Sequence, residues 1–259
     1  KRIQEIKDGG GIAAVSGTPI AAIKFNDLIK NSAADLFFLQ ATVVSTEHLG
    51  KEGSQNLDLY DLCQNIGIPV AVGNCVTYEV SLKLMRAGAA AVMVGIGPGA
   101  ACTSRGVLGV GIPQATAISD CAAARDDFQK ESGKYVPIIA DGGIITGGDI
   151  CKCIACGADS VMIGSPIARS QEAPGKGFHW GMATPSPVLP RGTRIKVGTT
   201  GSLKSIICGP AILDDGTHNL LGAIKTSMGT LGATDIKEMQ NVEVVIAPSL
   251  LTEGKVYQK

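Results

Sequence analysis

One cysteine, Cys102, lies on a glycine-dense turn after an apolar run and precedes two hydroxyl residues and an arginine. The stretch reads Val92-Met-Val-Gly-Ile-Gly-Pro-Gly-Ala-Ala-Cys-Thr-Ser-Arg105. Glycine has no side chain and tolerates positive φ, so a ligand can approach the main chain closely at such a turn. A cysteine beside a cationic side chain is typical of a nucleophile, whereas most free cysteines are packed core residues. Cys102 is therefore a candidate nucleophile, and a packed thiol is the alternative.

Three further turns after apolar runs have the composition of ligand-binding loops. They contain Asn74, Asp141-Gly142-Gly143 and Gly164-Ser165. An aspartate before two glycines can accept hydrogen bonds from sugar hydroxyls while the glycine amides face a phosphate. Gly-Ser at a helix N-terminus adds amides and a hydroxyl for the same anion. A plain strand-to-helix turn explains each glycine taken alone, but the set together with the nearby thiol predicts a nucleoside monophosphate site.

The elements that position these turns are predicted to be strands buried on both faces, because their apolar runs do not alternate with polar residues. The stretch 86–95 is echoed by 155–164, which indicates repeated strand–helix units. We expect helices at about 1–8, 22–32, 54–65, 78–87 and 218–237. The six expected strands are 12–15, 35–39, 69–72, 90–94, 137–140 and 160–163.

Repeated strand–helix units predict an α/β fold. A TIM (β/α)8 barrel is favoured over a doubly wound sheet. The composition agrees: 259 residues, 45% hydrophobic, 4% aromatic and 34 glycines. Because a barrel has eight strands, the first two strand–helix units are expected to be missing from this chain. We expect residues 1–259 to form one catalytic barrel domain, with a functional loop or flap at 168–217 and a C-terminal helix and tail.

The charge balance and the cysteine spacing indicate which partners and which location to expect. The 23 Lys and Arg residues balance 23 Asp and Glu residues, which argues against a nucleic-acid or anionic-membrane surface. No apolar run reaches the roughly 20 residues of a membrane span. The eight cysteines lack the regular spacing of a disulfide framework, so a reducing cytoplasm is the expected location. The expected partner is a small molecule.

The motifs resemble the IMP dehydrogenase and GMP reductase family over nearly the whole chain. The resemblance implies that Cys102 attacks C2 of a purine nucleotide monophosphate, GMP or IMP. A hydride then moves between C2 and NAD(H) or NADP(H) through a covalent thioimidate. It further implies a K⁺ ion, a homotetramer or octamer, and no CBS domain within this chain. The matching motifs are the Cys102 turn, Gly109-Val-Gly-Ile-Pro-Gln114, Ile139-Ala-Asp-Gly-Gly-Ile144, Val161-Met-Ile-Gly-Ser165 and Gly181-Met182.

The resemblance also implies a role for each site residue. Thr103 and Ser104 would complete the catalytic turn, and Asp141 would hold the ribose. Carbonyls of Gly97, Gly99 and Cys102 would bind the monovalent cation, with Glu253 contributed by a neighbouring subunit. The remaining substrate contacts would come from Asn74, Gly142, Gly143, Gly164, Ser165, His179, Gly181, Met182 and Arg191.

Several positions depart from the family pattern. Ala100 replaces a phosphate-binding serine, His179 a tyrosine, and Gln40 the aspartate that binds the cofactor ribose. Arg191 occupies the base-facing position of a Glu or Gln, and Ser104 stands where threonine is usual. The segment between Gly181-Met182 and Pro190-Arg191 is short, and the chain has none of the Arg-Tyr pairs with which IMP dehydrogenases activate water.

The short segment and the missing Arg-Tyr pair favour a GMP reductase, which converts GMP and NADPH to IMP and ammonia, although Arg191 stands where the glutamate of a GMP reductase handles ammonia. One alternative is an IMP dehydrogenase, which converts IMP, NAD and water to XMP. Another is a non-catalytic nucleotide-binding regulator. Without the resemblance, a phosphate-binding barrel lyase or isomerase would also fit the loops.

Overall fold

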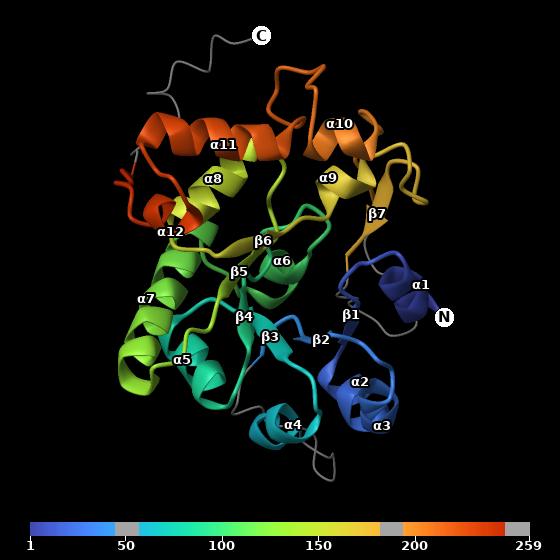
Figure 1. The fold of residues 1–259 in the computed structure, drawn as a ribbon, viewed down its shortest axis with the longest axis vertical. Coiled ribbons are helices and arrows are strands. Elements are labelled where there is room, and N and C mark those ends of the chain that lie inside the picture. Colours follow the sequence, from blue (N-terminus) through green and yellow to red (C-terminus); the bar gives the residue numbers. More distant parts are fainter. Residues whose placement is uncertain (45–56, 182–193, 247–259) are drawn as a thin grey trace.

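The computed structural model describes residues 1–44, 57–181 and 194–246. A parallel sheet of six strands lies at its centre, with the strands in chain order (Figure 1). Each strand overlaps an expected one, so the six strand predictions are confirmed. The strands are β1 (Ala14–Gly17), β2 (Leu36–Gln40), β3 (Val70–Cys75), β4 (Ala91–Val94), β5 (Ile138–Asp141) and β6 (Ser160–Met162).

The order of the strands decides between the two expected α/β architectures. Every strand pairs in parallel with its predecessor in the chain, whereas a doubly wound sheet reverses its strand order at a switch point. The sheet curls into part of a barrel, which agrees with a TIM-like α/β fold. Within the described residues β1 and β6 are the edge strands of this sheet. The two additional units, and a single domain over 1–259, remain predictions.

Side chains cap the starts of several helices. Thr18, Asp58, Thr77 and Thr146 each accept the backbone N–H three residues on. The helices are α1 (Arg2–Asp8), α2 (Pro19–Lys24), α3 (Asn26–Lys30), α4 (Leu59–Asn65), α5 (Tyr78–Arg86), α6 (Ser104–Leu108), α7 (Gln114–Ser132), α8 (Gly147–Ala155), α9 (Ser165–Ala168), α10 (Leu203–Ile207), α11 (Leu220–Leu231) and α12 (Ile236–Met239). In the part of the chain described, none has the length and apolar character that a membrane span requires.

Several elements differ from the sequence expectations. The helix expected at 218–237 is two helices, α11 and α12, separated by residues 232–235. The helix expected at 22–32 is two short helices, α2 and α3, which meet at Phe25. The long helix α7 was not expected, because its buried face consists largely of alanine and cysteine and gives a weak apolar period. The region 168–217, expected as a loop, contains α10 and the antiparallel hairpin of β7 (Phe178–Trp180) and β8 (Arg194–Lys196).

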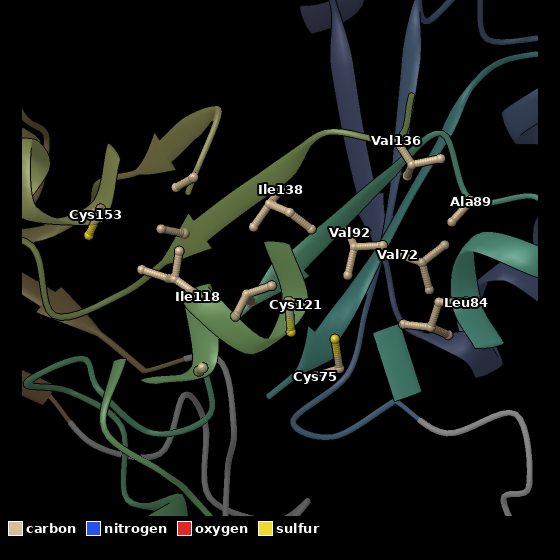
Figure 2. Packing of buried hydrophobic residues seen from close by; sticks show 14 of the residues in the cluster. Val72, Cys75, Leu84, Ala89, Val92, Ile118, Cys121, Val136, Ile138 and Cys153 are labelled. Atoms are coloured by element: carbon tan, nitrogen blue, oxygen red, sulfur yellow. The ribbon is translucent and has the colours of Figure 1, made fainter. Parts of the chain in front are cut away.

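The core is densest around β3 and β4, where every residue of both strands is buried. Figure 2 shows Val72 and Val92 in this cluster with Leu84 of α5. The side chains of Cys75 and Cys121 point toward one another there. Contact with Cys121 and burial raise the pKa of the Cys75 thiol well above its ordinary value. Cys75 therefore remains a protonated core thiol and is not a candidate nucleophile.

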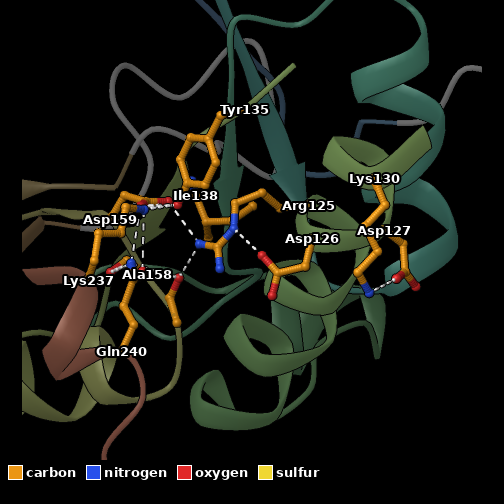
Figure 3. A network of polar contacts seen from close by, with 11 residues as sticks. Arg125, Asp126, Asp127, Lys130, Tyr135, Ile138, Ala158, Asp159, Lys237 and Gln240 are labelled. Carbon is orange, nitrogen blue, oxygen red and sulfur yellow. Dashed lines mark hydrogen bonds and ion pairs between the residues drawn. The ribbon is translucent and has the colours of Figure 1, made fainter. Parts of the chain in front are cut away.

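A polar network joins helices α7 and α12 to the sheet at the start of β6, and Asp159 is its centre (Figure 3). Both oxygens of the Asp159 carboxylate accept hydrogen bonds, which satisfies them although the side chain is largely buried. It accepts hydrogen bonds from Arg125 Nη1 at 3.0 Å, the Tyr135 hydroxyl, Ile138 N at 2.8 Å, Lys237 Nζ at 2.6 Å and Gln240 Nε2 at 3.0 Å.

We expect Asp159→Asn to lower the free energy of unfolding at neutral pH by about 2 kcal/mol or more. Burial alone would raise the pKa of Asp159, but its hydrogen bonds, led by that from Lys237, outweigh burial and lower the pKa to about 2. A carboxyl with a lowered native pKa contributes stability above its unfolded value near 3.8 and loses it as pH falls through about 2. Urea unfolding at neutral pH and near pH 2 measures the difference between wild type and variant. A difference that does not shrink at the lower pH contradicts the prediction.

Candidate active site

A cavity of about 500 Å³ lies at the carboxyl ends of the parallel strands. Residues at the ends of all six strands or in the loops after them line it, as do the last residues of β7 and Gly181. Loops at this end of a barrel sheet are where ligands bind in such folds. Of the predicted site residues, the cavity brings together Asn74, Gly97, Gly99, Cys102, Ser104, Asp141, Gly142, Gly143, Gly164, Ser165, His179 and Gly181.

Four predicted residues are not among those lining the cavity. Thr103 is next to Cys102 in the chain and precedes α6, but it does not line the cavity. Met182, Arg191 and Glu253 lie outside the described residues.

The Cys102 thiol is half-buried and adjoins a hydroxyl. Its Sγ lies 3.2 Å from Ser104 Oγ, and its backbone N–H donates to Gly99 O at 3.0 Å. Ser104 is the first residue of α6 and is only 3% exposed, so its hydroxyl is held in place. This pair gives the thiol a neighbouring group that can share its proton.

Arg105 does not pair with the thiol, contrary to the sequence expectation. Its Nε donates to Ile96 O at 3.1 Å and its Nη2 donates to Ile112 O at 2.7 Å. Ile96 and Ile112 are at the two ends of the loop that carries Cys102, and these ends lie close together. The Arg105 guanidinium, at the start of α6, contacts both of them. Arg105 therefore binds the loop backbone.

Asn74 and Asp141 form the second polar pair of the cavity. Asn74 Nδ2 donates to Asp141 Oδ2 at 2.7 Å and to Gly95 O at 2.8 Å. Burial raises the pKa of the Asp141 carboxyl above its ordinary value, and the Asn74 hydrogen bond opposes this in part. The sequence predicted Asn74 as a ligand contact, but in the structure its amide holds the carboxylate beside the start of the Cys102 turn.

The turn after β5 packs directly on the turn that carries Cys102. Gly142 and Gly143 have φ of +97° and +76°, a backbone that other residues rarely adopt. A Cβ on either would lie 3.0 Å from an atom of Pro98. Gly181 packs against the Ala101 carbonyl, and a Cβ on Gly181 would lie 2.4 Å from the Ala101 oxygen. Glycine is therefore required for these loops to approach the cysteine turn.

The far end of the cavity holds two polar side chains from β7 and α9. Ser165 Oγ lies 3.0 Å from His179 Nε2. Ser165 is the first residue of α9, and the neighbouring Gly164 also lines the cavity. A hydroxyl, an imidazole and free backbone N–H groups together are suited to an anion such as a phosphate.

The end of the cavity near β1 and β2 contains Thr18 and Thr42, which the sequence did not indicate as site residues, and Gln40, which stands where the family has its cofactor-ribose aspartate. Thr18 follows β1 and Thr42 follows β2, and both line the cavity. Gln40, at the end of β2, is 8% exposed, and its Nε2 faces Met93 Sδ at 3.4 Å and Met162 Sδ at 3.9 Å. A threonine before a proline indicates only a helix cap, so no sequence signal identified Thr18. This end supplies neutral hydroxyl and amide groups.

Comparisons with known proteins support the sequence resemblance. The family model for the IMP dehydrogenase / GMP reductase domain matches residues 13–184. An uncharacterized oxidoreductase from Mycobacterium leprae is 39% identical over 249 residues, which cover 95% of this chain and 66% of the relative. An inosine-5'-monophosphate dehydrogenase from Helicobacter pylori is 35% identical over 249 residues, covering 85% of this chain and 48% of the relative.

A solved structure is similar in both fold and sequence. It is an IMP dehydrogenase/GMP reductase-like protein from Corynebacterium glutamicum, with a TM-score of 0.86 and 38% identity. The match covers 95% of this chain and 64% of that protein. The chain thus spans less than two thirds of the length of these relatives, and about half that of the Helicobacter enzyme.

Proposed function

Because this chain belongs to the IMP dehydrogenase / GMP reductase family, we propose that it acts as an NAD(P)-dependent oxidoreductase at C2 of a purine nucleoside monophosphate. The observation that carries this proposal is the contact of Cys102 Sγ with Ser104 Oγ inside the cavity that also contains Asp141 and Ser165. A nucleophile, a ribose acceptor and a phosphate site on neighbouring loops suit a ligand with a base, a sugar and a phosphate.

In the proposed reaction the Cys102 thiolate adds to C2 of the purine, and the Ser104 hydroxyl donates a hydrogen bond to the sulfur. Asp141 accepts hydrogen bonds from the ribose hydroxyls. For GMP, the amino group takes up the proton that the thiol released and leaves as ammonia, and C2 stays bonded to sulfur as a thioimidate. Hydride addition to C2 and expulsion of the thiolate then give IMP. For IMP, hydride leaves C2, and water displaces the sulfur to give XMP.

The remaining predicted contacts complete the proposed substrate site. Ser165, His179 and the amides of Gly142, Gly143 and Gly164 bind the phosphate. Met182 contacts the base and Arg191 donates to the purine O6.

A nicotinamide dinucleotide would be held by Thr18, Gln40 and Thr42, at the end of the cavity near β1 and β2. When bound, this group would supply the hydride acceptor or donor for C2. Because Gln40 Nε2 faces the two methionine sulfurs, Gln40 Oε1 is left to accept from the ligand. An uncharged amide at this position is compatible with either NAD(H) or NADP(H).

A K⁺ ion fits the carbonyls of Gly97, Gly99 and Cys102, since backbone carbonyls are the ligands that K⁺ prefers. Gly99 O already accepts from Cys102 N, but a carbonyl oxygen has a second lone pair for a cation. We also propose that Glu253 of a neighbouring copy completes this site in a homotetramer or octamer. Light scattering of the full chain with and without K⁺ tests the assembly.

For the direction of the reaction, we propose GMP reduction first. The short segment between Gly181 and Pro190, and the lack of an Arg-Tyr pair in the sequence, disfavour the activation of water that IMP oxidation needs. IMP oxidation is the second candidate, favoured by the relatives named inosine-5'-monophosphate dehydrogenase at 34–38% identity.

Nicotinamide absorbance separates the two candidates. The full chain is incubated with GMP and NADPH, and separately with IMP and NAD. Oxidation of NADPH with GMP supports the first candidate, and reduction of NAD with IMP supports the second. Nucleotide binding without turnover in either assay, measured by calorimetry, would instead indicate a regulator.

The phosphate end of the site is tested by Ser165→Ala and His179→Ala. We expect each variant to weaken the binding of IMP and GMP by about tenfold, since each removes one hydrogen bond to a charged group. Binding of the nucleosides inosine and guanosine should not change, because they lack the phosphate. Calorimetry measures both affinities, with Ser132→Ala on the outer helix α7 as the control. An equal loss for nucleoside and nucleotide would refute the phosphate role.

A further inference from the structure

Three consecutive carbonyl groups lie at the base of the Cys102 turn, and each accepts a hydrogen bond from a different element. The donors are the side chains of a residue on α7, a residue on β3 and a residue on α6. The hydrogen bonds are Gln114 Nε2 to Val94 O at 2.8 Å, Asn74 Nδ2 to Gly95 O at 2.8 Å, and Arg105 Nε to Ile96 O at 3.1 Å.

Arg105 also binds the other end of the same loop. Its Nη2 donates to Ile112 O at 2.7 Å, so one guanidinium joins the beginning and the end of the loop. Two glycines make room for its side chain. A Cβ on Gly97 would lie 2.5 Å from Arg105 Cγ, and a Cβ on Gly111 would lie 2.7 Å from Arg105 Nε. The loop backbone is therefore shaped around this arginine.

The geometry requires a planar group with several donors. Arg105 uses nitrogens at two positions of its guanidinium to reach two carbonyls, which a lysine ammonium on a flexible stem cannot reproduce in a fixed arrangement. The loop is rich in glycine, so without this connection its backbone has many accessible conformations. Cys102 precedes Arg105 by three residues and lies on the same loop.

We propose that Arg105 is a positioning residue that fixes the Cys102 thiol for attack by connecting the two ends of its loop. The inference rests on the proposed role of Cys102 as the nucleophile. Arg105 acts through hydrogen-bond geometry at Ile96 and Ile112, and not through its charge at the thiol. A misplacement of the attacking atom by about 1 Å can cost roughly a hundredfold in rate.

The variants Arg105→Lys and Arg105→Met test this proposal in the full chain. We expect both to lower kcat at least about tenfold, while the Kd for IMP and GMP stays within about twofold. Hydrogen exchange should accelerate at residues 95–113 and not in β4 or α7. Arg86→Lys and Arg86→Met are the matched controls, because Arg86 pairs with Glu131 on the outer helices α5 and α7.

Arg105→Lys also separates geometry from charge, since lysine keeps the positive charge and loses the second hydrogen bond. If Arg105→Lys retains wild-type kcat, the charge is sufficient and the positioning role is overturned. The same conclusion follows if Arg105→Met leaves both kcat and hydrogen exchange unchanged.

Gly97→Ala provides an independent test, because its Cβ would displace the Arg105 side chain. Its backbone strain at φ of +75° is the same with or without Arg105 and cancels in a double-mutant cycle. We expect the double variant Gly97→Ala with Arg105→Met to have a kcat within about threefold of Gly97→Ala alone. Losses of kcat that multiply would contradict the connection between the two residues.

The outcomes distinguish failure of this inference from failure of the proposed function. Turnover that persists in Cys102→Ala refutes the proposed nucleophile, whatever Arg105 does. A Cys102→Ala variant without activity, together with fully active Arg105→Met, overturns only the positioning role. Hydrogen exchange at 95–113 reports on the loop connection without any turnover.

Discussion

Cys102→Ala is expected to lower turnover at least about a thousandfold, while the affinity for IMP and GMP stays within about threefold. The thiol supplies the bond to C2, and no other described cysteine lines the cavity. Binding should survive because the groups proposed to hold the ribose and phosphate, Asp141 and Ser165, come from other loops. Nicotinamide absorbance measures turnover, and calorimetry measures binding.

A control variant and a mass-spectrometric measurement show whether the loss of turnover is specific to the Cys102 thiol. Cys208→Ala removes an exposed thiol outside the cavity and should retain full activity. Mass spectrometry of acid-quenched wild-type enzyme should find nucleotide bonded to the peptide that contains Cys102. Persistent turnover in Cys102→Ala would rule out the thioimidate and would leave a binding or regulatory role for the site.

Asp141→Asn is expected to weaken nucleotide binding by about a hundredfold and to raise the melting temperature. The carboxylate is proposed to accept hydrogen bonds from two ribose hydroxyls, and charged acceptors contribute about 1.5–3 kcal/mol each. Asparagine at this position keeps the shape and can still accept from Asn74 through its carbonyl oxygen, so the local fold should persist.

The stability gain follows from the sign of the pKa shift. Burial raises the native pKa of Asp141 above 3.8, so the folded protein holds the proton more tightly than the unfolded chain does. The resulting stabilisation is present below pH 3.8 and is lost as pH rises through the native pKa. At neutral pH the buried carboxylate therefore destabilises the fold, and the neutral amide removes that cost.

A pH series checks both effects of Asp141. Differential scanning calorimetry should show the largest difference in melting temperature at neutral pH and a shrinking difference toward pH 3.8. Nucleotide affinity of the wild type should fall as Asp141 becomes protonated, whereas that of Asp141→Asn should not follow this titration. Asp120→Asn, on an exposed position of α7, is the control. A lower melting temperature for Asp141→Asn at neutral pH would contradict the argument.

Much of the fold could be predicted because strands buried on both faces have a simple pattern. The expected strands at 69–72 and 90–94 consist of apolar residues and proline, and β3 and β4 overlap them, although β3 continues through Asn74 to Cys75. α7 gave no such pattern. Small alanines and Cys121 share its buried face with larger Ile118, so its apolar period is weak although the helix is long.

The amino-acid sequence by itself determined which residue types stand at each strand end. Cys102, Asp141 and the glycines beside them are local features, because turn geometry and residue type are properties of neighbouring positions in the chain. Only the tertiary structure decided how these features combine. Asn74 and Asp141 are 67 residues apart, and their hydrogen bond depends on the order in which β3, β4 and β5 pair.

The partners of Arg105 illustrate the same distinction at short range. Its position three residues after Cys102 suggested a charge beside the thiol, but the side chain reaches carbonyls 9 residues before it and 7 after it. The partners of Arg105 depend on how the loop folds back to bring its two ends together, and sequence spacing does not show this. Residue types thus follow from the sequence, whereas their partners follow from the path of the chain in space.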